Sequence, residues 1–259
     1  MLIDLHVHSH HTRGCTRSPR DAVRRAKQAV LDGIAFTDWN KLDGLEEFRA
    51  AGRDEGFLAL CGVEVVTDRG HYLCFFPDPS KVPPPPQLFG STTPWPARDV
   101  LARVRALGGV VVAAHPYDKG VDRPSGDFIF TIDGLTAIEG LNARHRGPAN
   151  DLAIEAADHM TLPCTGASGA HEAGEIGAAA TLFRDPVASE ADLVAQLKAG
   201  TVYCVAIGVV PAPPEREERR ERHGRGRDER RGGERRGGHG HGGHGGGRSG
   251  GHGGRGGRR

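Results

Sequence analysis

Short apolar runs alternate with amphipathic stretches over roughly the first 206 residues, and this alternation limits the possible folds more than any other feature. The runs expected to form strands are 3–7, 34–38, 57–66, 70–76, 110–116, 135–144, 162–168 and 201–207. Helices are expected over 18–33, 43–52, 96–107, 149–160 and 189–199, the first of them with Ser18 as N-cap. Repeated strand-then-helix units of this length predict an α/β fold in which crossover helices join parallel strands.

Ionisable side chains stand near the ends of several of these predicted strands. They are His6, His8, Asp38, Glu64, His115 and His171. Because the carboxyl ends of parallel strands carry the chemistry in such folds, these side chains are expected to converge on one site. Six such groups spread along the chain are difficult to explain by packing alone.

The segment "IDLHVHSHH" has four histidines within six residues. In a strand, the alternation of side chains places Asp4, His6 and His8 on one face, and the aliphatic residues between them on the other. Histidines accompanied by carboxylates, with no cysteine pair, suit Zn²⁺, Mn²⁺ or Fe²⁺. His10 and His11 lie just beyond the strand, and two interpretations of them stay open: substitute metal ligands or exposed loop histidines.

The net charge of +1 hides an asymmetry along the chain. Residues 215–259 contain fourteen Arg and seven acidic residues, which leaves 20 basic and 26 acidic residues in the remainder. The tail has almost no apolar residue, so a folded domain is expected over 1–208 and a disordered Arg/Gly/His-rich tail over 209–259. Such a tail either binds nucleic acid through phosphate charge or is a passenger segment outside the core.

The five cysteines lack the close spacing of metal-binding pairs, and no secretory leader precedes the first strand. A reduced, cytoplasmic protein is therefore expected. No apolar run approaches the ~20 residues that span a bilayer, so no membrane association is expected.

Seven segments together resemble the PHP (polymerase and histidinol phosphatase) domain family. They are, in chain order, "DLHVHS", "FTDWN", "GVEV", "GHYLCFF", "AHP", "IEGLNAR" and "ASGAH". The resemblance implies a distorted seven-stranded (β/α) barrel with a metal centre at the carboxyl ends of its strands, which hydrolyses phosphoesters. It also implies that His6, His8 and Glu64 hold a first metal, that Glu64, His71 and His115 hold a second, and that His171 belongs to a third site.

Three positions depart from the family's pattern. Trp39 stands where the family usually has histidine, and an indole cannot ligate a divalent metal. Gly169 replaces a carboxylate expected on the first metal, and Arg13-Gly14 replaces an acidic residue of the loop after the first strand. One or two divalent ions per chain, Mn, Zn or Fe, are therefore expected rather than three.

The resulting hypothesis is a metal-dependent phosphoesterase acting on a small phosphomonoester or a nucleotide. Glu64 is the expected catalytic carboxylate, beside the water between the metals, and Asp38 is expected to orient a ligating imidazole or else to occupy a turn. Arg13, Lys41 and Arg144 are candidates for binding phosphate, whereas His145 is assigned to structure. The alternative is a catalytically impaired pseudoenzyme that binds metal or a phosphorylated ligand, and a second alternative is nucleic-acid binding through the tail.

Overall fold

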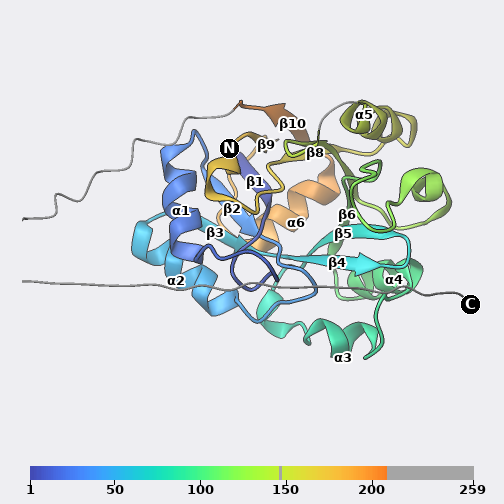
Figure 1. Cartoon of the computed structure of the whole chain (residues 1–259), viewed down its shortest axis with the longest axis horizontal. Coiled ribbons are helices and arrows are strands. Elements are labelled where there is room, and N and C mark those ends of the chain that lie inside the picture. The colour runs from blue at the N-terminus through green and yellow to red at the C-terminus, as the bar shows by residue number, and fades with distance from the viewer. Residues whose placement is uncertain (146–147, 209–259) are drawn as a thin grey trace, which may run out of the picture. The chain divides into compact units, whose positions relative to one another are not determined.

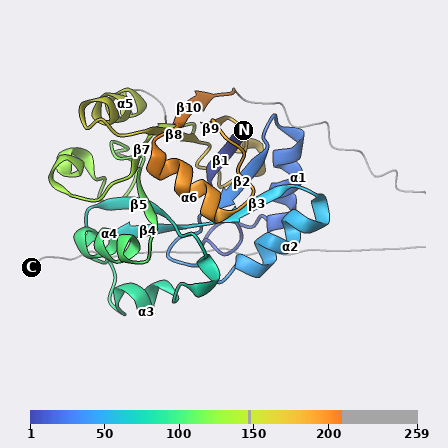
Figure 2. The ribbon, with the colours of Figure 1, turned by 180° about the vertical axis from the view of Figure 1, so that it is seen from behind.

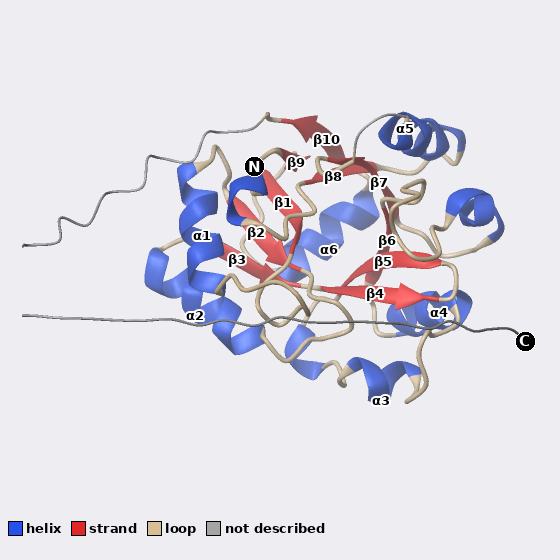
Figure 3. Ribbon diagram, viewed as in Figure 1, coloured by secondary structure: helices blue, strands red, loops and turns tan. Residues whose placement is uncertain are grey.

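The computed structural model describes residues 1–145 and 148–208, and the predicted tail lies outside the described residues. Ten strands in this part of the chain form two five-stranded sheets, with helices against them (Figure 1, Figure 3). The mixed α/β class is therefore confirmed. Within the described part, no helix combines the length and the apolar character needed to cross a membrane.

The first sheet has the strand order β10-β9-β1-β2-β3. Its strands are β1 (Leu2–Val7), β2 (Gly33–Phe36), β3 (Leu58–Cys61), β9 (Ala179–Phe183) and β10 (Val202–Ala206). The β1, β2 and β3 strands are parallel, whereas β9 runs antiparallel to both β1 and β10. The sequence analysis did not predict β9. Two helices, α1 (Pro19–Gln28) and α2 (Leu45–Glu55), connect the three parallel strands.

The second sheet has the order β4-β5-β6-β7-β8. It contains β4 (Val63–Thr67), β5 (Gly70–Phe75), β6 (Val110–Ala114), β7 (Ala137–Asn142) and β8 (Cys164–Ala167). Residues 57–66, predicted as one strand, divide at Gly62 between the two sheets. A Cβ at Gly62 would lie 2.5 Å from the Phe75 ring, so only glycine allows this close passage between β3 and β4.

The prediction of parallel strands joined by crossover helices is wrong for part of the fold. The β4–β5 and β5–β6 pairs are antiparallel, and only β6–β7 and β7–β8 are parallel in the second sheet. In the described residues, the strand pairing gives two sheets rather than one closed seven-stranded barrel. The sheets meet through isolated bridges at Val7–Ala170 and Trp39–Glu64, next to residues of the predicted metal centre.

Three apolar clusters support this arrangement. Helix α6 (Glu190–Ala199) inserts Leu193, Val194 and Leu197 into a cluster that also contains Ile3 of β1 and Val112 of β6. Seen from behind, α6 lies across both sheets (Figure 2). The other two clusters pack α1 and α2 against the first sheet, and α4 (Ala97–Ala106) and α5 (Ala149–His159) against the second.

The predicted helices are present with shifted ends. The Ser18 side chain accepts a hydrogen bond from the Asp21 backbone, as an N-cap does, but α1 ends at Gln28 and not at Gly33. Gly33 instead begins β2, where a Cβ would lie 2.9 Å from a methyl group of Leu58. One further short helix, α3 (Pro85–Phe89), lies in a proline-rich segment and was not among the predicted helices.

Candidate metal centre

The first strand carries the histidine pair into a buried position. His6 lies on β1 and His8 one residue past its end, with exposed fractions of 2% and 1%. Ile3, Leu5 and Val7 of the strand are buried as well, so β1 is enclosed on both faces from Ile3 onward. Burial of two imidazoles at one strand end requires polar partners for their nitrogen atoms.

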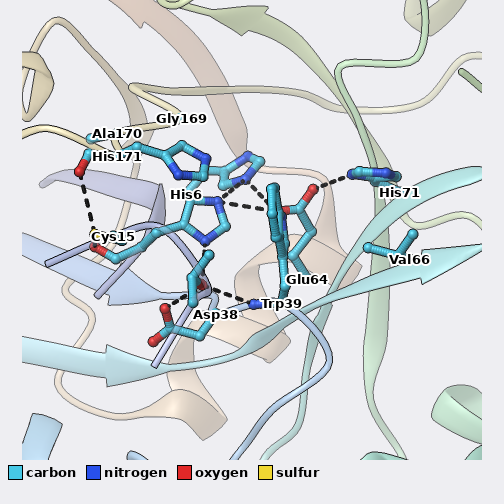
Figure 4. A network of polar contacts seen from close by, with 12 residues as sticks. His6, Cys15, Asp38, Trp39, Glu64, Val66, His71, Gly169, Ala170 and His171 are labelled. Atoms are coloured by element: carbon cyan, nitrogen blue, oxygen red, sulfur yellow. Dashed lines mark hydrogen bonds and ion pairs between the residues drawn. The ribbon is translucent and has the colours of Figure 1, made fainter. Parts of the chain in front are cut away.

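Glu64 on β4 supplies these partners with one fully buried carboxylate. Its Oε2 lies 3.0 Å from His6 Nε2 and 3.1 Å from His8 Nε2. Its Oε1 lies 2.6 Å from His71 Nδ1 and 3.3 Å from His115 Nε2. The two oxygens therefore face two different pairs of imidazoles. Figure 4 shows the Glu64 carboxylate between His6 and His71.

The His6 and His8 rings are each oriented by a polar contact on the side that faces away from Glu64. His6 Nδ1 lies 2.9 Å from Glu139 Oε1, and His8 Nδ1 lies 3.0 Å from Thr12 Oγ1. When each ring is neutral and carries its proton on Nδ1, as a ligating imidazole does, both Nε2 atoms present a lone pair to the centre. This is the arrangement of metal-ligating histidines, in which a second partner fixes the tautomer.

Glu139 on β7 contacts the candidate centre, and the sequence analysis missed it. It is fully buried, and its second oxygen accepts hydrogen bonds from the His115 backbone and from Asn142 Nδ2. The His115 backbone has a φ of 29°, a strained value for a non-glycine residue, and the bond to Glu139 helps to hold it there. The sequence feature that could have identified Glu139 is a glutamate inside the apolar strand segment "IEGLNAR".

Asp38 does not contact an imidazole directly. Its carboxylate accepts hydrogen bonds from the backbone and hydroxyl of Ser9 and from the hydroxyl of Thr12. Thr12 in turn contacts His8, so Asp38 acts on the His8 ring through Thr12 and also orders the loop after β1. Cys15 donates to the carbonyls of His8 and His171, which directs its thiol away from the imidazoles.

Trp39 occupies the side of the centre where the family pattern has a histidine. Its indole Nε1 donates to Glu64 Oε2 at 2.7 Å. Its ring packs edge-on against His8 and His171, at centroid distances of 5.6 and 5.3 Å. An indole N–H can only donate, so it competes with a cation for that carboxylate oxygen.

Gly169 has a φ of 63°, in the left-handed region. A Cβ there would lie 2.6 Å from Asn142 Nδ2, an atom that already donates to Glu139. A carboxylate at this position therefore requires both a strained backbone and a shift of Asn142. The neighbouring His171 ring stacks on His8 at a centroid distance of 4.2 Å.

Charges within the centre follow from these contacts. Burial opposes ionisation of Glu64, yet the charge of His6 and hydrogen bonds from the surrounding imidazoles hold its pKa well below the usual value. Burial likewise opposes a charge on His6, but Glu139 and Glu64 raise its pKa well above the usual value. For His171, burial and the neighbouring His8 and Arg144 lower the pKa to about 3, so that this imidazole is neutral at physiological pH. The centre thus combines ionised carboxylates with imidazoles in one enclosed space.

A cavity of about 550 Å³ opens onto this centre. Its lining includes the five proposed ligands of the first two metals, and also Trp39, Asp118, Asn142, Arg144, His145, Gly169 and His171. Of the three predicted phosphate-binding residues, only Arg144 lines it, with guanidinium contacts to the Gly169 carbonyl and the Glu175 carboxylate. Arg13 and Lys41 are exposed and lie outside the lining.

His145, assigned to structure from the sequence, lines the cavity. Its Nδ1 lies 3.2 Å from Asp118 Oδ2, and its ring packs against His115 at a centroid distance of 5.2 Å. Its Nε2 is buried and has no hydrogen-bond partner among the described residues. The loop after β7 thus contributes two adjacent polar side chains, Arg144 and His145, to the same cavity.

The fold and the buried histidine–carboxylate cluster define an α/β protein with a candidate divalent-metal centre. The PHP domain model matches residues 4–117, and the PHP-associated model matches residues 147–202. The chain contains a PHP domain followed by a PHP-associated segment, as its sequence motifs suggested.

One curated relative and several solved structures are similar to this chain. The chain is 26% identical over 168 residues to an uncharacterized protein of Methanocaldococcus jannaschii, covering 60% of this chain and 90% of that protein. A protein of Bifidobacterium adolescentis, provisionally named a metal-dependent phosphoesterase, has a TM-score of 0.54 at 21% identity, with 66% and 88% of the two chains covered. A two-domain protein of Bacteroides vulgatus containing a predicted PHP-like metal-dependent phosphoesterase has a TM-score of 0.57 at 16% identity, with 80% and 65% covered. At 16–21% sequence identity, the similarity to these structures shows a common fold and nothing further.

Proposed function

We propose that the protein is a metal-dependent phosphoesterase that acts on a small phosphomonoester or a nucleotide. The observation that carries the proposal is the division of the Glu64 carboxylate between two imidazole pairs. One oxygen faces His6 and His8, and the other faces His71 and His115. A carboxylate in this position is suited to bridge two divalent ions.

The donor set fits such ions. His6, His8 and Glu64 would hold one ion, and Glu64, His71 and His115 would hold the other. Imidazole nitrogens and carboxylate oxygens, without thiolates, suit Mn²⁺, Zn²⁺ or Fe²⁺. The ionised state of Glu64 and Glu139 supplies the negative charge that two cations require.

The ions would supply the positive charge that activates water and polarises a phosphate ester. The protein's own residues prepare the site for that charge. Glu139 and Thr12 fix the rings of His6 and His8, and Asp38 holds Thr12 in place. Arg144, at the rim of the cavity, is placed to bind phosphate oxygens through its guanidinium.

A catalytically impaired protein is the second candidate, and one observation favours it. The Trp39 indole donates to the same Glu64 oxygen that faces His6 and His8. The protein would then bind one ion at the His71 and His115 side, or a phosphorylated ligand, with little turnover. The two candidates differ in ion count and in rate, and both quantities can be measured on one sample.

The test uses the full chain, stripped with a chelator and reloaded separately with Mn²⁺, Zn²⁺ or Fe²⁺. Ion content is measured by elemental analysis, and hydrolysis is measured with 4-nitrophenyl phosphate and a panel of nucleotides. Two ions per chain in excess of those that a Glu64→Gln variant retains, together with metal-dependent hydrolysis, support the phosphoesterase. One such ion with no hydrolysis of any substrate supports the impaired protein, and no excess over the variant contradicts a metal centre at Glu64.

A further inference from the structure

His10 and His11 do not turn toward the metal centre. His10 Nε2 lies 3.1 Å from Glu47 Oε2, and His11 Nε2 lies 2.8 Å from the same oxygen. Glu47 lies in the first turn of α2, 36 residues beyond His11 in the chain. Two adjacent loop histidines and a helix carboxylate thus meet at one point outside the cavity.

We propose that His10, His11 and Glu47 form a second, peripheral site for a divalent transition-metal ion such as Zn²⁺. Two imidazoles and one carboxylate are the protein ligands of many zinc sites that keep a further position open to water. One ligand atom of each of these residues lies within 4.8 Å of the other two. This site is separate from the proposed phosphoesterase and does not depend on it.

The distances are close to those around a bound ion. With metal–ligand bonds of about 2.0–2.1 Å in a tetrahedral arrangement, neighbouring ligand atoms are roughly 3.3 Å apart. The nitrogen–oxygen distances of 2.8 and 3.1 Å need to widen by only a few tenths of an ångström. Partial exposure of the side chains, 40% for His10 and 21% for His11, leaves room for water at the remaining positions.

The ligand positions are also held by the surrounding structure. The His10 backbone donates to the Arg17 carbonyl, and the His11 backbone donates to the Ser9 hydroxyl. Ser9 is in turn held by Asp38, and the His11 ring packs edge-on against Phe48. Little conformational entropy therefore remains to be lost when an ion binds.

Such an ion would tie the loop after β1 to α2. That loop carries His8 and Thr12 of the metal centre, so the peripheral ion would stabilise the segment from which the centre is built. Imidazole-rich sites of this kind favour Zn²⁺, Cu²⁺ or Ni²⁺ over Mg²⁺ or Ca²⁺. The ion expected at this peripheral site is therefore a transition-metal ion of borderline softness.

The chain offers a matched control on the same helix turn. Glu46 is adjacent to Glu47, and its side chain is 78% exposed and pairs with Arg49. Glu47→Gln removes a proposed ligand, whereas Glu46→Gln removes the same charge without touching the site. Five further histidines lie beyond residue 208 in both variants, so any ion that they bind cancels in the comparison.

The experiment measures Zn²⁺ bound per chain by equilibrium dialysis and elemental analysis for the full-length protein and three variants. Glu47→Gln and the double change His10→Gln with His11→Gln should each bind one ion fewer than wild type, or bind it at least about 10-fold more weakly. Glu46→Gln should match wild type, and circular dichroism checks the fold of every variant. Unchanged Zn²⁺ content and affinity in both site variants would overturn the proposal, whatever the outcome of the phosphatase assay.

Discussion

The two halves of the candidate centre differ in completeness. On the side of the second sheet, Glu64, His71 and His115 make direct contacts and match the family pattern. Around His6 and His8 of the first sheet, which we call the first-sheet half, Trp39 after β2 and Gly169 after β8 stand where the pattern has a histidine and a carboxylate. His171 of the same half packs against the Trp39 ring. Strands support the side chains of both halves, so the two halves differ in the ligands that they carry.

The contacts of Trp39 account for the difference between the two halves. Trp39 fills space beside His8 and also satisfies a lone pair of Glu64 through its indole N–H. A histidine in its place offers a lone pair to a cation, whereas the indole can offer only a proton. The following predictions test whether the two halves differ in ion binding as they differ in ligands.

The largest effect is expected from Glu64→Gln, because this carboxylate serves both halves. Loss of its charge should remove ions from both positions and lower hydrolysis by about 1,000-fold, the upper range for losing one preorganised charged group. Elemental analysis and 4-nitrophenyl phosphate turnover are the measurements. Glu155→Gln, on the exposed face of α5, is the matched control and should behave as wild type. Loss of only one ion would refute the bridging role of Glu64.

Glu139→Gln should have the next largest effect. It should lower the metal affinity of both halves, but less than Glu64→Gln does. Glu139 contacts His6 on one side and the His115 backbone on the other. Loss of an outer carboxylate partner costs about 10–100-fold in metal affinity. Titration of the stripped protein with Zn²⁺ or Mn²⁺ measures the change. An unchanged affinity at both positions would mean that His6 keeps its orientation without Glu139.

Local sequence patterns predicted much of this centre and of the helices around it. The alternation along β1 indicated that His6 and His8 share a face, and Ser18 indicated where α1 begins. These inferences succeeded because strand periodicity and helix capping involve residues close together in the chain.

Features that depend on distant contacts were not predicted. The break at Gly62 follows from its contact with Phe75, and the role of Glu139 follows from a partner 133 residues away. The convergence of His10 and His11 on Glu47 likewise requires the packing of α2 beside the loop after β1. No local periodicity carries such information.

A smaller effect is expected from Arg144→Ala, which tests substrate binding and leaves the ions in place. Loss of a charge-assisted hydrogen bond to phosphate should raise KM about 10-fold, with ion content unchanged. Arg13→Ala is the matched control, since Arg13 is exposed and lies outside the cavity lining, and its KM should equal that of wild type. Equal KM changes in the two variants would remove Arg144 from the proposed phosphate site.

The smallest effect is expected from Trp39→His, a gain rather than a loss. The new imidazole would stand beside His8 and His171, where it offers a lone pair in place of the indole donor. Ion content should rise by up to one per chain, and hydrolysis should rise several-fold. Because Trp39 is only partly buried, the lost packing should cost about 1 kcal/mol of stability, well below the cost of truncating a fully buried tryptophan.

The companion change Gly169→Asp is expected to cancel this gain rather than add to it. Its Cβ would displace Asn142, which donates to Glu139, and Glu139 orients His6. The comparison therefore needs Trp39→His alone, Gly169→Asp alone and the double variant, each with ion content, melting temperature and aryl phosphate turnover. A wild-type protein that already binds two ions and turns over rapidly, with no gain in Trp39→His, would show that the indole does not impair the first-sheet half. Higher ion content and rate in Trp39→His, lost again in the double variant, would show that the indole limits this half and that Asn142 couples Gly169 to the centre.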